Sequence, residues 1–176
     1  MSPAEAQQGS LFWRFSLRFY RQPKVADACI ALQEQAGVDV NLLLFLLWHA
    51  TYKRELSAAE VAELEGRIGP WRNATVVPLR AVRRALKSPP GLVTPAAAEL
   101  FRTKIKAVEL EAERLQQEAM YELARPPLLG REAPSPEDAA RTNVAAYETM
   151  RQTAFPKPAT ETLLAAFASL ERKPEE

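Results

Sequence analysis

The sequence contains little of what secreted proteins and many enzymes rely on. One cysteine, Cys29, occurs among its 176 residues. It cannot form an internal disulfide, so a reducing, cytoplasmic location is expected. One histidine, His49, excludes a metal site built from several histidines. A net charge of +1 gives no overall field to attract nucleic acid or an anionic membrane, so such a partner would need a local basic patch.

Long apolar runs and signature motifs are also missing. The longest apolar run, Leu42–Trp48, is far shorter than the roughly 20 residues that cross a bilayer, so no membrane span is expected. The first ten residues lack the basic and apolar regions of a secretory signal. The chain has no P-loop, GxGxxG, HExxH, GxSxG or CxxC motif. We therefore expect no cofactor and no metal, and an enzyme is the less favoured class.

Helical periodicity, by contrast, runs along almost the whole chain. The segment Gly37–Tyr52 begins with the capping residues Asp39 and Asn41 and then becomes apolar on nearly every side. A helix of this kind must be enclosed by other helices. The sequence therefore predicts an all-α, irregular multi-helix bundle around a buried central helix.

Other helices follow from caps and breaks, such as the capping box Ser57–Glu60 and the break at residues 89–91. The predicted helices cover approximately residues 11–21, 25–35, 58–67, 76–88, 95–125, 137–152 and 160–172. We expect the helix at 58–67 to stop at Gly66 or Gly69, with a loop over residues 70–73. In the helix at 76–88, Leu79, Val82 and Leu86 form the predicted inward face.

The long helix at 95–125 carries an apolar heptad seam. Its members are Phe101, Ile105, Val108, Ala112, Leu115 and Ala119. The seam could pair with a helix of the same chain or with a partner. We predict a core helical domain over residues 1–90, with the long helix and two further helices over 91–176 packing on it as one globule.

A basic stripe is the strongest candidate for a binding surface. Four cations stand on one face of the helix at 76–88 because their spacing is i, i+3, i+4 and i+7. The predicted binding residues are Trp71, Arg72, Arg80, Arg83, Arg84 and Lys87. Guanidinium groups suit phosphates and carboxylates. The facing acid could be internal, from Glu60, Glu63, Glu109 or Glu113, or it could belong to a partner. Trp71 could stack on a base or partner side chain, or it could cover the core.

Two reactive side chains remain as catalytic candidates. His49 is the only histidine, and it could act as a general acid or base. Cys29 could be a nucleophile paired with it, although a buried cysteine usually serves as a small apolar residue. Asp39 and Asn41 suit helix capping, and we expect Asp39 to pair with an arginine, Arg80 being the first choice.

Two segments carry a resemblance to a known group of proteins. They are WRFSLRFYRQPKVADACIALQEQAGVDVNLLLFLLW and PWRNATVVPLRAVRRALK. Over about residues 11–87 the chain resembles an uncharacterised, mostly proteobacterial family of short helical proteins with a conserved domain of unknown function. The resemblance implies a bacterial, cytoplasmic, helical protein, and it transfers no activity, cofactor or catalytic residue.

Three hypotheses follow. The first is a non-enzymatic protein–protein interaction or accessory protein that uses the basic helix surface. The second is a protein that binds nucleic acid or a phosphate ligand through the same stripe, recognisable by a steep salt dependence. The third is an enzyme that uses His49, which would need solvent access and a second polar group nearby. The partner and the oligomeric state stay open.

Overall fold

The computed structural model describes residues 9–124 and 128–171, and within them the chain folds into eight α-helices and one two-stranded sheet. The helices are α2 (Leu11–Tyr20), α3 (Val25–Ala36), α4 (Val40–Thr51), α5 (Ala58–Ala74), α6 (Val76–Ala85), α7 (Pro95–Leu123), α8 (Pro136–Arg151) and α9 (Lys157–Glu171). The strands β1 (Arg54–Glu55) and β2 (Arg131–Glu132) pair antiparallel. The predicted all-α class is confirmed. None of the described helices is long and apolar enough to cross a membrane.

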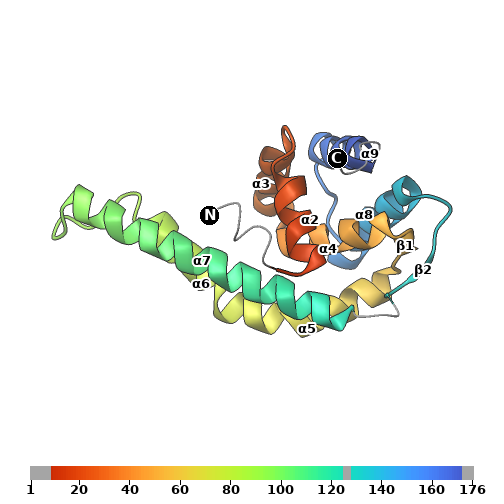
Figure 1. Ribbon diagram of the computed structural model, residues 1–176. Helices are drawn as coiled ribbons and strands as arrows, with labels where there is room; N and C mark the ends of the chain where they lie inside the picture. Colours follow the sequence, from red (N-terminus) through yellow and green to blue (C-terminus); the bar gives the residue numbers. More distant parts are fainter. Residues whose placement is uncertain (1–8, 125–127, 172–176) are drawn as a thin grey trace.

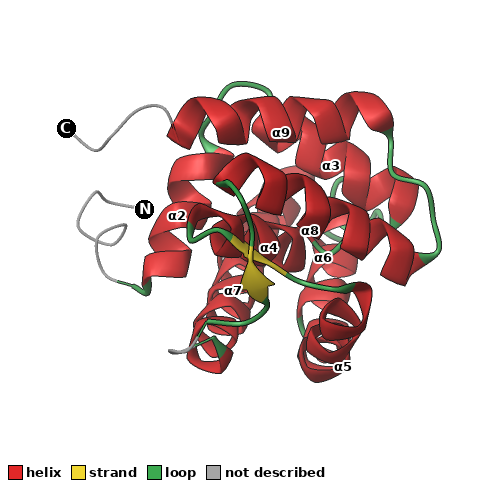
Figure 2. Ribbon diagram, turned by 90° about the vertical axis from the view of Figure 1, so that its right-hand side faces the viewer, coloured by secondary structure: helices red, strands yellow, loops and turns green. Residues whose placement is uncertain are grey.

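Helix α4 forms the centre of the bundle, as predicted. Every residue from Asn41 to Ala50 is buried. Helices α2, α3, α7 and α8 pack around it, and α9 closes the far side of α3 (Figures 1 and 2). The ring of Phe12 meets the ring of Phe45 edge-on, with 5.1 Å between centroids. Asp39 caps α4 by accepting from the backbone N–H of Asn41 at 2.9 Å.

Helix α8 attaches to this centre through a buried amide. Asn143 donates its side-chain N–H groups to the carbonyls of Leu46 and Arg54, at 2.8 and 3.0 Å. Its side-chain oxygen accepts from the backbone N–H of Leu56 at 2.7 Å. One side chain therefore holds α8, α4 and the strand β1 together. The predicted division at residue 90 stays a prediction.

The short sheet requires a glycine at one position. Gly130 has φ +77, and a Cβ there would collide with the carbonyl oxygen of Glu55. The guanidinium of Arg54 donates to the carbonyls of Leu128, Leu129 and Gly130. Strands of two residues are too short to show an alternation of apolar and polar side chains, so the sequence pattern does not predict this sheet.

An extended arm leaves the globule on one side (Figure 1). We use "the arm" for α6, the loop that follows it and the first half of α7, residues 76–110. Helix α6 lies along α7, and α5 lies along the second half of α7. Thr94 caps α7 by accepting from the N–H of Ala97, with Pro95 in the first turn, as predicted.

The prediction that α5 ends at Gly66 or Gly69 was wrong. The helix continues through Pro70 to Ala74, so the expected loop at 70–73 is helical. The residue four before Pro70 is Gly66, and the helix passes both of these breakers. The tertiary contacts of Trp71 and Arg72, described below, hold the extra turns in place.

The predicted inward face of α6 was wrong at Val82. Val82 is 43% exposed, Leu79 and Leu86 are half-buried, and Val76 is the buried side chain of the helix. The reason is electrostatic. Helix α6 turns part of its basic face toward α7, where Glu109 pairs with Arg80 and Arg83. Charge pairing thus outweighs the modest apolar area that α6 could bury.

Candidate binding cleft

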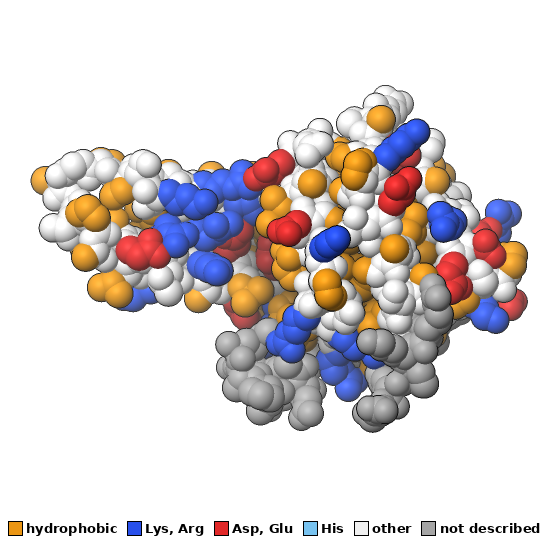
Figure 3. Space-filling view, turned by 90° about the horizontal axis from the view of Figure 1, so that it is seen from above, with side chains coloured by type: hydrophobic (Ala, Val, Ile, Leu, Met, Phe, Trp, Pro, Cys, Tyr) orange, Lys and Arg blue, Asp and Glu red, His pale blue; other side chains and the backbone are white. Residues whose placement is uncertain are grey.

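A large open cleft of about 820 Å³ separates the globule from the arm. Helices α2 and α3 form one wall, with Tyr20, Ile30 and Glu34 among the lining residues. Helices α6 and α7 form the other wall, and Leu44 of α4 lies at the bottom. Seen from above, lysine and arginine side chains gather on the arm next to the globule (Figure 3).

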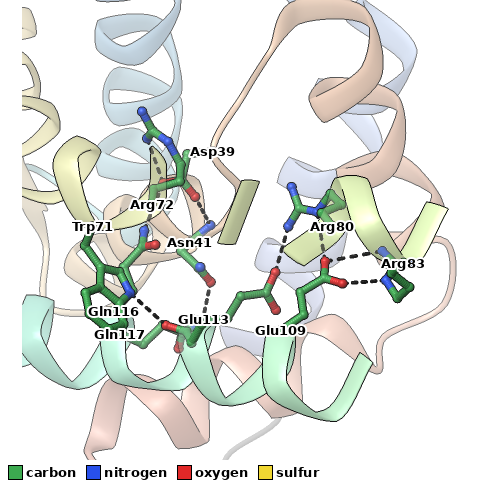
Figure 4. A network of polar contacts seen from close by, with 11 residues as sticks. Asp39, Asn41, Trp71, Arg72, Arg80, Arg83, Glu109, Glu113, Gln116 and Gln117 are labelled. Atoms are coloured by element: carbon green, nitrogen blue, oxygen red, sulfur yellow. Dashed lines mark hydrogen bonds and ion pairs between the residues drawn. The ribbon is translucent and has the colours of Figure 1, made fainter. Parts of the chain in front are cut away.

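Arg80 and Arg83 face carboxylates of α7 (Figure 4). The Nε of Arg80 donates to Oε1 of Glu109 at 2.9 Å, and its Nη2 donates to Glu113 at 2.7 Å. Arg83 donates to both carboxylate oxygens of Glu109, Nη2 lying 3.2 Å from Oε1. The predicted internal partners Glu109 and Glu113 are therefore confirmed for these two arginines.

The two carboxylates respond differently to this environment. Burial alone would raise the pKa of Glu109, but hydrogen bonds from Arg83 and Arg80 outweigh it and hold the pKa below its usual value. Burial dominates at Glu113 and raises its pKa, even though Arg80 opposes the change. Hydrogen bonding to Glu109 raises the pKa of Arg83. Glu109 is therefore the anchor of the arm's ion pairs.

The remaining cations of the stripe stay open to solvent. Arg84 lies 3.4 Å from Glu34 across the cleft, with side chains that are 49% and 56% exposed. Lys87 is exposed at the end of the stripe. An exposed ion pair of this geometry contributes little to stability. These two cations can therefore bind an external anion at small cost to the fold.

The charges of the lining residues do not balance. The cations are Arg21, Arg80, Arg83, Arg84, Lys87 and Lys106, and the anions are Glu34, Glu109 and Glu113. Six positive groups thus face three negative groups. Two of the cations, Arg21 and Lys106, were not among the binding residues predicted from the sequence. Lys106 lies three residues before Glu109 on α7, a spacing that places both on one face and could have identified it.

Arg72 lies outside this cleft. It donates to Asp39 at 2.9 Å and to both carboxylate oxygens of Glu65, and Gln116 also donates to Asp39 at 2.9 Å (Figure 4). The hydrogen bond with Glu65 is the main cause of a raised pKa for Arg72. Asp39 does pair with an arginine, but the expected partner Arg80 was wrong. Arg72 therefore joins α5 to the start of α4.

Trp71 points to a different surface again. Its indole N–H donates to the carbonyl of Ala112 at 3.0 Å, and the side chain is 41% exposed. It borders a separate groove of about 430 Å³ between α5 and α7. The six residues predicted as one binding set therefore divide among the cleft, a junction and this outer groove.

The two catalytic candidates are sealed in the core. His49 is fully buried, and its Nδ1–H donates to the carbonyl of Phe45 at 2.9 Å. Burial lowers the pKa of His49 to about 4, which keeps the imidazole neutral. Cys29 lies under the α3 wall of the cleft but has no exposed surface, and burial raises the pKa of its thiol to about 12. Neither side chain can meet a substrate in this conformation. Among the described residues, no group of three or more histidine, cysteine or acidic side chains is placed to hold a metal.

The chain matches a family model. It is a family described as proteins of unknown function, DUF2390, and it covers residues 11–120. The chain belongs to this family. The match extends well beyond residue 87, where the sequence resemblance ended, and reaches into the last turns of α7. The DUF2390 region therefore contains both walls of the cleft and the whole arm. Comparison with curated proteins and with solved structures finds no match.

Proposed function

We propose that the protein is a non-enzymatic binding protein, an adaptor or accessory subunit, whose cleft receives an acidic segment of a partner protein. The observation that supports this proposal most is the charge excess of the cleft, six cations against three carboxylates. A partner that brings carboxylates to Arg84 and Lys87 would neutralise most of this excess. Such complementarity contributes to both the rate and the specificity of association.

The apolar lining favours a protein segment over a bare anion. Ile30 is 45% exposed and Leu110 is 43% exposed, and both line the cleft beside the cations. Tyr20 is 40% exposed on the α2 side. A peptide with acidic and apolar side chains could satisfy both kinds of surface, because interfaces combine an apolar centre with a charged rim.

Nucleic acid or another phosphate ligand is the second candidate. The regular spacing of Arg80, Arg83, Arg84 and Lys87 along α6 favours it, because a row of cations can follow a phosphate backbone. Trp71, the side chain expected to stack on a base, faces the outer groove, where it cannot reach a ligand in the cleft. We therefore place this candidate behind the acidic protein segment.

Bacterial origin and a cytoplasmic location complete the proposal. The origin rests on the resemblance of residues 11–87 to a mostly proteobacterial family. The location rests on Cys29, a single cysteine that is fully buried as a free thiol in a chain with no disulfide partner.

The test compares two double charge reversals of equal net change. Arg84→Glu/Lys87→Glu alters the cleft, and Arg141→Glu/Lys157→Glu alters an exposed arginine on α8 and an exposed lysine on α9, away from the cleft and the outer groove. The binding of a fluorescent acidic peptide is measured by anisotropy, and native partners are captured in parallel. We expect the cleft variant to lose about tenfold or more in affinity while the control keeps it. Arg80 and Arg83 are left in place, because their removal would leave Glu109 buried without its partners.

Three results would contradict the proposal. Equal binding by the cleft variant and the control would remove the cleft from the interface. A cleft variant that unfolds, as judged by circular dichroism, would make Arg84 and Lys87 structural. Tight binding of a labelled oligonucleotide, with affinity falling steeply with salt, would favour the second candidate instead.

A further inference from the structure

Large apolar side chains are exposed mainly on and beside the arm. Among the described residues, fourteen large hydrophobic side chains are exposed, and ten of them lie between residues 71 and 115. Leu92 at the tip is 96% exposed, and Leu100 is 70% exposed. An apolar surface this concentrated is typical of a protein interface.

Part of this surface is a continuous stripe along α7. Phe101, Val108 and Leu115 are spaced by seven residues, so they lie on one face of the helix, and they are 52%, 52% and 49% exposed. They belong to the predicted heptad seam. Within that seam Ala112 is buried and Ile105 is half-buried, so α5 and α6 cover only one edge of it. The other edge remains available to a second helix.

The outer groove continues the stripe toward the globule. It holds about 430 Å³ between α5 and α7, and its lining includes Ile68, Trp71, Leu115, Ala119 and Leu123. This surface is separate from the basic cleft, because the α7 side chains that line the cleft, such as Lys106 and Leu110, stand on another face. A partner on the stripe would therefore leave the cleft open.

The charges beside the stripe indicate which partner fits. Lys104 and Glu111 are exposed, make no ion pair with any described residue and stand seven residues apart along the same edge of the stripe. If a second α7 lay parallel, the edge that carries Lys104 and Glu111 would face the opposite edge of the second stripe, which α5 and α6 already cover. If the second α7 lay antiparallel, Lys104 of each copy would face Glu111 of the other. The same register brings Ile105 against Val108 and sets Phe101 of each copy between the exposed Val108 and Leu115 of the other.

We propose that two copies of the chain associate through this stripe, with their α7 helices antiparallel about a two-fold axis near residues 105–108. The contact is self-complementary, since each copy supplies the same apolar residues together with one lysine and one glutamate on the open edge. Unlike-charge pairs at the edge fix the register, and the apolar side chains supply the association energy. The inference does not depend on what the cleft binds.

Sedimentation equilibrium over a wide range of protein concentration tests the proposal. We expect the wild type to dimerise and Val108→Asp to weaken the dimer by about a hundredfold, because a carboxylate at the stripe's centre would be buried without a partner. Circular dichroism and thermal unfolding check that this variant keeps its fold, which the exposure of Val108 makes the expected result.

Charge swaps test the antiparallel register. Lys104→Glu or Glu111→Lys alone should weaken the dimer by about tenfold, because two attractive pairs become repulsive. The double variant Lys104→Glu/Glu111→Lys should restore it, and the exposed Lys157→Glu on α9 serves as the matched control. A wild type that is monomeric throughout would overturn the proposal and leave the stripe to a different partner. Single swaps that behave like Lys157→Glu, or a double variant that fails to recover, would overturn the register.

Discussion

The globule and the arm are held in place by different kinds of contact. In α4 every residue from Asn41 to Ala50 is buried, and apolar packing determines where the helix lies. In α6 the buried side chain is Val76, and the helix is held to α7 through Arg80, Arg83 and Glu109. The difference shows that apolar burial is concentrated in one part of the molecule, while the arm keeps its apolar and basic groups on the surface.

The side chains that stabilise the fold and the side chains that are free to bind a partner therefore lie in different parts of the molecule. A side chain whose removal costs little folding energy is free to serve a partner, and the exposed groups of the arm have this property. The buried groups of α4 do not.

The largest effect is expected in the central helix. Leu46→Ala should lower the free energy of unfolding by about 3–5 kcal/mol, because Leu46 is fully buried and the substitution leaves a cavity. Val82→Ala on α6 should cost less than about 1 kcal/mol, since this side chain is 43% exposed. Urea denaturation of both variants measures the difference. Similar losses would erase the distinction between globule and arm.

Acid should weaken the globule through His49. The pKa of His49 is about 4 in the folded protein and near 6.5 in the unfolded protein. Between these two pH values the imidazole is protonated in the unfolded state and neutral in the folded state. Stability is therefore fully present above pH 6.5 and falls as the pH drops toward 4. The loss at pH 4.5 is about 2–3 kcal/mol.

The variant His49→Phe isolates this contribution. Thermal unfolding of the variant and the wild type, each at neutral pH and at pH 4.5, should show a smaller acid-induced loss for His49→Phe. Identical losses would mean that carboxylates elsewhere, and not the buried imidazole, dominate the acid response.

The junction of α4 and α5 should show an intermediate effect. Asp39→Ala removes the N-cap of α4 and the acceptor for Arg72 and Gln116, with an expected cost of about 2 kcal/mol. Arg72→Ala should cost a similar amount, and the double variant should cost less than the sum, since both singles break the same contact. Additive losses would mean that Asp39 and Arg72 stabilise the fold through independent contacts.

The smallest effect is expected in the arm. Glu109→Gln should cost only about 1 kcal/mol, because Arg80 retains Glu113 and Arg83 can turn to solvent. Hydrogen exchange should speed up in α6 and leave α4 unchanged. A loss as large as that of Leu46→Ala, or faster exchange in α4, would show that the arm supports the core.

The sequence predicted the elements that local signals define. Ser10, Ser57 and Thr94 cap their helices as expected, and the apolar run after Asn41 identified the centre. These features depend on neighbouring residues alone, so a single sequence contains the information. The pairing of Arg80 and Arg83 with Glu109 and Glu113 was one of several open alternatives.

Other features depend on tertiary contacts that no local pattern reveals. Helix α5 passes Pro70 because Trp71 and Arg72 find partners on α7 and α4. Asp39 pairs with Arg72 and not with Arg80, because the extension of α5 places Arg72 beside Asp39. The heptad seam was visible in the sequence, but which edge it would leave exposed depended on where α5 and α6 lie. Asn143 was missed, since a polar residue within a helix gives no sign that it will be buried.

Hydrogen exchange measured by mass spectrometry, at low protein concentration, tests the separation of globule and arm most directly. We expect the amides of α4 to exchange only through global unfolding, whereas those of α6 should exchange at least about a hundredfold faster through local opening. Equal protection of α4 and α6 would contradict this expectation, because the arm would then be part of the cooperative core and its exposed surface would not be free for binding.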